Sequence, residues 1–156
     1  MQVPPAFDPL RLWEHVHGHL GWLAAAAVTH PAILLRPSRD GGARRATLSV
    51  ALAVAFLTLA GAFGVAMYPA YRESLRAPLF AQAPTIGYLF ERKEHLAFGA
   101  ILFGWAGGAG YAGSLRAQGH VRSALRRAAH VAFVAAAAIA FVTAVLGTIV
   151  STYKTF

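Results

Sequence analysis

Four long apolar stretches constrain the fold of this chain more than any other feature of its sequence. They run over about residues 12–35, 46–68, 95–113 and 128–150, and short segments rich in arginine, proline and glycine separate them. A helix needs roughly 20 apolar residues to cross a bilayer, and each stretch is close to that length. Because helices satisfy their backbone hydrogen bonds internally, the sequence predicts an all-α integral membrane four-helix bundle. We expect up-down topology in one transmembrane domain spanning residues 1–156.

The composition also indicates that lipid surrounds most of the chain. Of 156 residues, 57% are hydrophobic and 13% are charged, whereas a soluble domain usually carries about 25% charged residues. The absence of cysteine excludes disulfide scaffolds, Cys-ligated zinc and iron–sulfur clusters. The net charge is +8, but the arginines lie between the apolar stretches. This placement is typical of topology signals and anionic-lipid contacts, so we expect no nucleic-acid partner.

The connecting segments hold seven of the eight prolines, and the one that precedes the first stretch is expected to be non-helical. They are a lead-in over 1–11, a turn over 36–42, an interfacial connection over 69–91, a basic loop over 114–127 and a tail over 151–156. Pro69 is expected to end the second span. The loops 36–45 and 114–127 each hold four arginines, so the positive-inside rule predicts that both are cytoplasmic and both termini outside. We expect the protein to lie in a bacterial inner membrane.

Six histidines lie near the ends of these stretches. Three occupy every second position of the segment WEHVHGH, and the full set is His15, His17, His19, His30, His95 and His130. An ionisable side chain inside a membrane is costly and usually faces a partner or a cavity. With the predicted topology, the set divides into an outer layer (His15, His17, His19, His95) and an inner layer (His30, His130).

The helical wheel assigns these histidines to faces. At 100° per residue, His15, His19, Ala26 and His30 share one stripe, while His17 points the opposite way and is expected to be interfacial. His95 shares a stripe with Gly99, Leu102, Ala106 and Ala109, and His130 shares one with Val134, Ala137, Phe141 and Thr148. The small residues in these stripes leave room either for a flat macrocycle or for tight helix packing. The glycine-rich segment 104–113 is interpreted as a helix–helix contact surface.

This arrangement resembles the membrane-embedded b-type cytochromes, in which paired histidines on neighbouring helices of a four-helix bundle ligate two haems. The resemblance implies an electron carrier or subunit with two haems b and no catalytic residue of its own. It implies that His19 or His15 pairs with His95 at the outer haem, and His30 with His130 at the inner one. It also implies that Arg126, with Arg36 and Arg127, pairs with haem propionates. A quinone would exchange electrons near the proton partners Tyr68, Tyr71, Arg72 and Glu94.

Two other interpretations remain open. The dipeptide Glu-His recurs at the heads of the first and third stretches, as Glu14-His15 and Glu94-His95. Such nitrogen and oxygen ligands suit non-haem zinc, copper(II) or iron. Alternatively, the chain is a non-catalytic accessory subunit whose small-residue faces contact other membrane subunits or further copies of itself.

Overall fold

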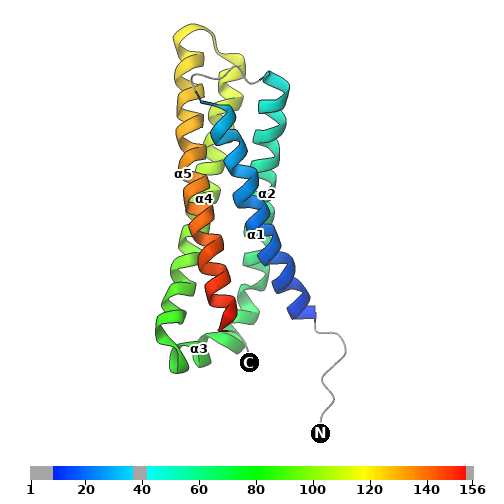
Figure 1. Ribbon diagram of the computed structural model, residues 1–156, viewed down its shortest axis with the longest axis vertical. Coiled ribbons are helices and arrows are strands. Elements are labelled where there is room, and N and C mark those ends of the chain that lie inside the picture. The colour runs from blue at the N-terminus through cyan, green and yellow to red at the C-terminus, as the bar shows by residue number, and fades with distance from the viewer. Residues whose placement is uncertain (1–8, 37–41, 154–156) are drawn as a thin grey trace.

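The computed structural model describes residues 9–36 and 42–153. Every regular element in these two ranges is a helix and neither contains a strand, so the all-α prediction is confirmed. The elements are α1 (Pro9–Leu34), α2 (Ala43–Ala70), the π-helical turn η1 (Tyr71–Leu75), α3 (Arg76–Gln82), α4 (Pro84–Arg116) and α5 (Gly119–Thr152). Four long helices lie side by side, with the short α3 at one end (Figure 1).

Three helical segments are long and apolar enough to cross a membrane. They are Ala43–Gln82, Pro84–Arg116 and Gly119–Thr152. α1 is not among them; its sequence includes Arg11, Glu14 and four histidines. The three segments support a membrane location, whereas a fourth span over 12–35 stays a prediction.

The four long helices contact one another in a ring. α1 packs against α2 and α5, and α4 packs against the same two helices, so α1 and α4 lie at diagonal corners. Successive long helices run in opposite directions (Figure 1). We call the end where α1 begins and α5 finishes the termini end. The opposite end, where α2 and α5 begin, is the arginine-rich end.

Small residues form the contact between α4 and α5. Phe133 of α5 is fully buried, and its ring lies over Gly107 of α4. One turn along α4, Gly110 faces Ala129 of α5. Glycine at these positions lets the two helix backbones approach closely, as small residues do between membrane helices. The predicted contact role of segment 104–113 is therefore confirmed.

The connection after α2 is helical, so the prediction that Pro69 ends the helix was wrong. α2 continues to Ala70 and passes through η1 into α3. A proline removes one helical hydrogen bond, and a π-helical turn directly after it accommodates the altered pairing. Tyr71 within this turn stacks on Phe90 of α4, with ring centroids 3.9 Å apart. This tertiary packing stabilises a helical path through a segment that contains three prolines.

Other predicted boundaries also differ from the structure. α1 begins at Pro9 rather than near residue 12, and α5 extends to Thr152. The predicted basic loop over 114–127 is mostly helical, because α4 reaches Arg116 and α5 begins at Gly119. Gly119 has a φ of +54°, a left-handed conformation that glycine adopts without steric cost and that permits this tight turn. The remaining parts of the predicted lead-in, turn and tail (1–8, 37–41 and 154–156) lie outside the described residues.

Candidate functional site

Packing contacts place the histidines at two levels. His17 lies against Gly64 near the termini end of α2; a Cβ at Gly64 would be 3.2 Å from the His17 ring. Nδ1 of His30 is hydrogen-bonded to Oγ of Ser49 at 2.9 Å, near the other end of α2. His130 is at a level close to that of His30. Ala129, next to His130, packs beside Gly110 of α4. Tyr111, which follows Gly110, is hydrogen-bonded at 3.0 Å to Thr47 of α2. Thr47 is two residues from Ser49, the partner of His30.

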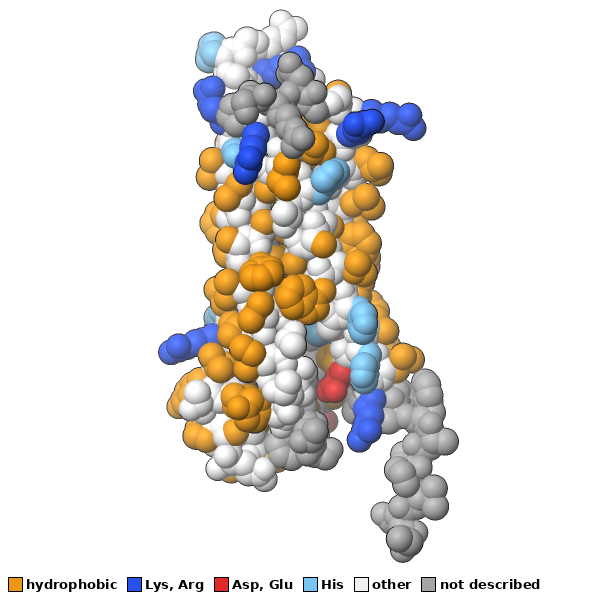
Figure 2. Space-filling view, viewed as in Figure 1, with side chains coloured by type: hydrophobic (Ala, Val, Ile, Leu, Met, Phe, Trp, Pro, Cys, Tyr) orange, Lys and Arg blue, Asp and Glu red, His pale blue; other side chains and the backbone are white. Residues whose placement is uncertain are grey.

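The face of α1 that turns inward is not the one expected from the sequence. His15, His19, Ala26 and His30 are exposed, whereas the buried residues of this helix are Ala24, Ala25, Val28, Pro31 and Ala32. His17 does lie opposite the stripe, as predicted, and it is half-buried against Gly64; its interfacial position stays a prediction. Histidine side chains are visible at the surface on the face of the molecule that α1 covers (Figure 2).

The predicted stripes of α4 and α5 also lie largely outside. His95 is exposed, Leu102 is 62% exposed and Phe141 is 57% exposed. The inward residues of α4 include Ala100, Gly104 and Gly107. Small residues such as these allow the closest helix approach.

Three exposed histidines share one local geometry. Nδ1 of each donates a hydrogen bond to the backbone carbonyl four residues earlier: His15 to Arg11 at 2.6 Å, His19 to His15 at 2.8 Å, and His95 to Glu91 at 2.7 Å. Because a carbonyl only accepts, Nδ1 must carry the proton, and Nε2 of a neutral ring keeps its lone pair. Metal-ligating histidines commonly have this arrangement, in which the hydrogen bond fixes the tautomer and the ring orientation.

A small cavity of about 80 Å³ lies at the termini end. Its lining includes Glu14, His17, Tyr68, Tyr71, Lys93 and Glu94. Tyr71 is 6% exposed, and its hydroxyl has no hydrogen-bond partner among the described residues. Of the residues predicted to serve a quinone, Tyr68, Tyr71 and Glu94 line this cavity, whereas Arg72 is exposed outside it. The volume suffices for a few water molecules.

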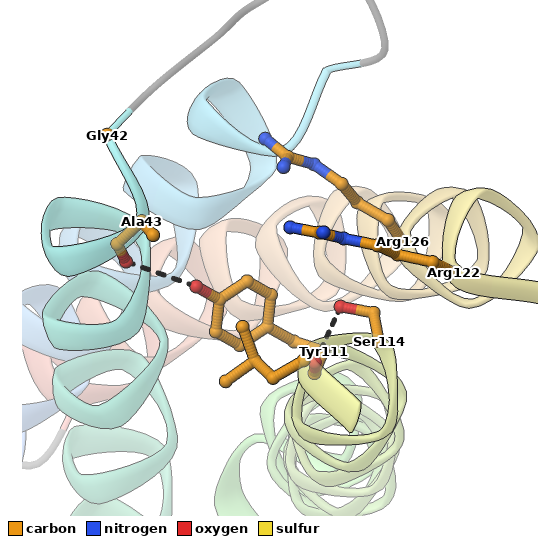
Figure 3. A pocket seen from close by; sticks show the side chains of 7 residues that line it. Gly42, Ala43, Tyr111, Ser114, Arg122 and Arg126 are labelled. Carbon is orange, nitrogen blue, oxygen red and sulfur yellow. Dashed lines mark hydrogen bonds between the residues drawn. The ribbon is translucent and has the colours of Figure 1, made fainter. Parts of the chain in front are cut away.

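A larger cavity of about 220 Å³ lies at the arginine-rich end, between α2, α4 and α5. Arg122 and Arg126 extend over it from α5, above Tyr111 and Ser114 of α4 (Figure 3). Arg126 was predicted to serve haem propionates, but His30 and His130 do not line this cavity. Arg122, which lines the cavity beside Arg126, was not among the predicted site residues. The spacing of four residues between Arg122 and Arg126 was the available signal, since such residues share a helix face.

Charge is unevenly distributed between the two ends. All four described carboxylates lie at the termini end: Glu14, Glu73, Glu91 and Glu94. Seven described arginines lie at the other end: Arg36, Arg44, Arg45, Arg116, Arg122, Arg126 and Arg127. Arginine side chains surround that end in Figure 2, and the carboxylates visible in this view lie at the opposite one.

The histidine pairs predicted for haem do not enclose one within a single chain. His19 and His95 are exposed and belong to the diagonal helices α1 and α4. His30 and His130 belong to neighbouring helices, but His30 is exposed and bonded to Ser49 of α2. Neither cavity is lined by both members of a pair. Among the described residues, no three His, Asp or Glu side chains cluster closely enough to hold a metal ion.

No known protein family, curated protein or solved structure matches the chain. Its function must therefore be argued from its residues. Of these, the exposed imidazoles with fixed Nδ1 protons suit metal ligation at the helix surface, because Nε2 points away from the backbone acceptor.

Proposed function

We propose that the chain is a membrane electron carrier similar to b-type cytochromes, with haem bound at the outer surface of its helices and between chains. The observation that carries this proposal is the shared geometry of His15, His19 and His95. Each ring is exposed and uses Nδ1 on its own helix. Nε2 is then the atom offered outward, to an iron that a second chain or subunit also ligates.

In this proposal the chain is a transmembrane four-helix bundle, with α1 as its fourth span. The arginine-rich end lies in the cytoplasm of a bacterial cell and the termini end outside the inner membrane. Seven described arginines at the first end, against four described arginines and one lysine at the second, support that orientation. The positive-inside rule counts basic residues in the short segments next to the spans.

Haem iron that carried two imidazole ligands would exchange one electron with little rearrangement and would have no open position for oxygen. The chain's own residues hold the ligand rings in place for this. The backbone carbonyls of Arg11, His15 and Glu91 accept the Nδ1 protons at the termini end. Ser49 Oγ holds the ring of His30 at the other level. Loss of such a hydrogen-bond partner typically lowers metal affinity about 10–100-fold. A second haem would bind at the level of His30 and His130.

The cavity at the termini end supports a quinone as the redox partner. Reducing a quinone takes up protons, and this cavity holds Tyr71, Glu94 and His17. The Tyr71 hydroxyl lacks a hydrogen-bond partner in the described part of the chain. In this proposal the hydroxyl would donate a hydrogen bond to a quinone oxygen that enters the cavity.

Absorption spectroscopy of the purified protein tests the proposal. The protein, produced with ample haem, is expected to show a Soret band, and sharp α and β bands after reduction with dithionite. His19→Ala is expected to lower the haem content per chain. His120→Ala is the matched control, because His120 is also exposed but lies outside both predicted pairs. A protein without a Soret band, or equal haem loss in both variants, would contradict the proposal.

A second candidate is binding of a non-haem metal at the same surface. His15 and His19 are exposed and lie one helical turn apart on the same face of α1. Two histidines at this spacing occur in zinc-binding helices, and imidazole also suits copper. Calorimetric titration with zinc or copper(II) decides this candidate. The non-haem candidate predicts about one bound ion per chain and no binding by the His19→Ala variant. It also predicts that the purified protein shows no haem bands.

A further inference from the structure

The cavity at the arginine-rich end has the composition of an anion site. Its upper wall consists of the guanidinium groups of Arg122 and Arg126, which extend side by side from successive turns of α5 (Figure 3). Guanidinium groups carry several donors in a fixed plane and bind phosphate oxygens in pairs. Among the described residues no carboxylate lines the cavity, and the four described carboxylates lie at the other end of the molecule.

The hydroxyl groups at the floor of the cavity already donate hydrogen bonds to backbone carbonyls. The Tyr111 hydroxyl donates to the carbonyl of Ala43 at 3.2 Å, and Ser114 Oγ donates to the carbonyl of Tyr111 at 2.7 Å. Both side chains are buried, and the Tyr111 bond joins the last turns of α4 to the start of α2 beside the cavity. Arg122 and Arg126 are the charged side chains among the described residues that line the cavity. The start of α2 at Gly42 and Ala43 also lines the cavity and adds the positive end of a helix dipole.

The cavity also has an apolar edge. Leu115 lines it and is 51% exposed. The site lies at the end of α4 and the beginning of α5, two helices that are apolar enough to cross a membrane. If these two helices cross a membrane, the ends that line the cavity lie toward the headgroup region, where lipid phosphates are found. A ligand with an anionic head and an apolar body matches both parts of the lining.

We propose that this cavity binds the phosphate group of an anionic phospholipid. Basic pockets between membrane helices on the cytoplasmic side are sites where such headgroups bind. The two guanidinium groups would hold the phosphate oxygens, and Leu115 would contact the first acyl carbons. The proposal concerns a site at the opposite end from the cavity with Tyr71, and it does not depend on haem binding.

Native mass spectrometry of the detergent-solubilised protein, titrated with phosphatidylglycerol, tests this proposal. The variants Arg122→Gln and Arg126→Gln are each expected to weaken binding of the first lipid about fivefold, the change that corresponds to ~1 kcal/mol per basic residue. Arg116→Gln is the matched control, because it removes an exposed arginine from the same end that does not line the cavity. Its binding is expected to stay within about twofold of that of the original chain.

Three outcomes would overturn the proposal. Equal weakening in Arg116→Gln would indicate attraction to charge spread over the whole end. Unchanged binding in both cavity variants would exclude the site. Displacement of the lipid by millimolar inorganic phosphate would identify a free anion as the ligand. Arg122→Lys keeps the charge without the guanidinium plane, and we expect an intermediate loss. Circular dichroism of each variant separates weaker binding from misfolding.

Discussion

Gly107→Ala is expected to destabilise the contact between α4 and α5. A Cβ at this position would lie 2.9 Å from Cδ2 and Cε2 of Phe133, whereas carbon atoms in contact prefer about 3.5–4.0 Å. The Phe133 side chain is fully buried, so its ring has no free side into which to move. Overpacking of this kind typically costs ~1–3 kcal/mol. Replacing glycine with alanine in a helix offsets up to ~1 kcal/mol of that cost.

Gly110→Ala is the matched control for this prediction. It lies one turn away on the same helix and gains the same helix propensity, but its Cβ would lie an ordinary 3.5 Å from the Cβ of Ala129. The difference between the two variants therefore isolates the contact with Phe133. For a chain of this size, ~1 kcal/mol corresponds to roughly 2–4 °C in the unfolding midpoint.

Thermal unfolding in detergent micelles, followed by circular dichroism, measures that difference. We expect Gly107→Ala to unfold at least a few degrees below Gly110→Ala, and the further change Phe133→Leu to recover part of the loss. Equal midpoints for the two alanine variants, or a higher midpoint for Gly107→Ala, would refute the proposed packing of α4 against α5.

Three further substitutions test individual interactions. Ser49→Ala removes the 2.9 Å hydrogen bond to His30 and is expected to cost about 1 kcal/mol, measured by denaturant unfolding; no change would mean that the bond does not form in solution. Tyr71→Phe removes a buried hydroxyl that lacks a partner in the described residues, so stability is expected to be unchanged or higher, and a loss above ~1 kcal/mol would reveal a bonded hydroxyl. Arg76→Gln breaks the exposed 3.0 Å ion pair with Glu91 and should change stability by less than ~1 kcal/mol. A larger change that persists in high salt would contradict the solvent-exposed geometry.

The helical elements were predictable because length and hydropathy determine them locally. The stretch over 46–68 lies within α2 and the stretch over 128–150 within α5. Their ends were less predictable, because they depend on packing between distant residues. Pro69 signalled a helix end, but the stacking of Tyr71 on Phe90 stabilises a continuous helical path. No local pattern in the sequence encodes that contact.

The inward faces of the helices were not predictable from polarity. In a soluble helix the apolar stripe turns inward, but large apolar residues such as Leu102 and Phe141 are exposed on these helices. Small size is a better guide to the inward face of these helices, because glycine and alanine let two helix backbones approach closely. The assumption that histidines face inward reversed the prediction for α1. The opposition of His17 to His15 and His19 followed correctly from the helical wheel, because it depends only on helix geometry.

The most direct test of the proposed function is the haem content of the purified protein as a function of particle mass. Size-exclusion chromatography with light scattering gives the mass, while absorbance at 280 nm and in the Soret region gives the haem per chain. The outward imidazoles of His15, His19 and His95 predict Soret absorbance only in particles larger than one chain. A haem-loaded monomer would contradict ligation between chains, and particles of every mass without haem would contradict the function itself.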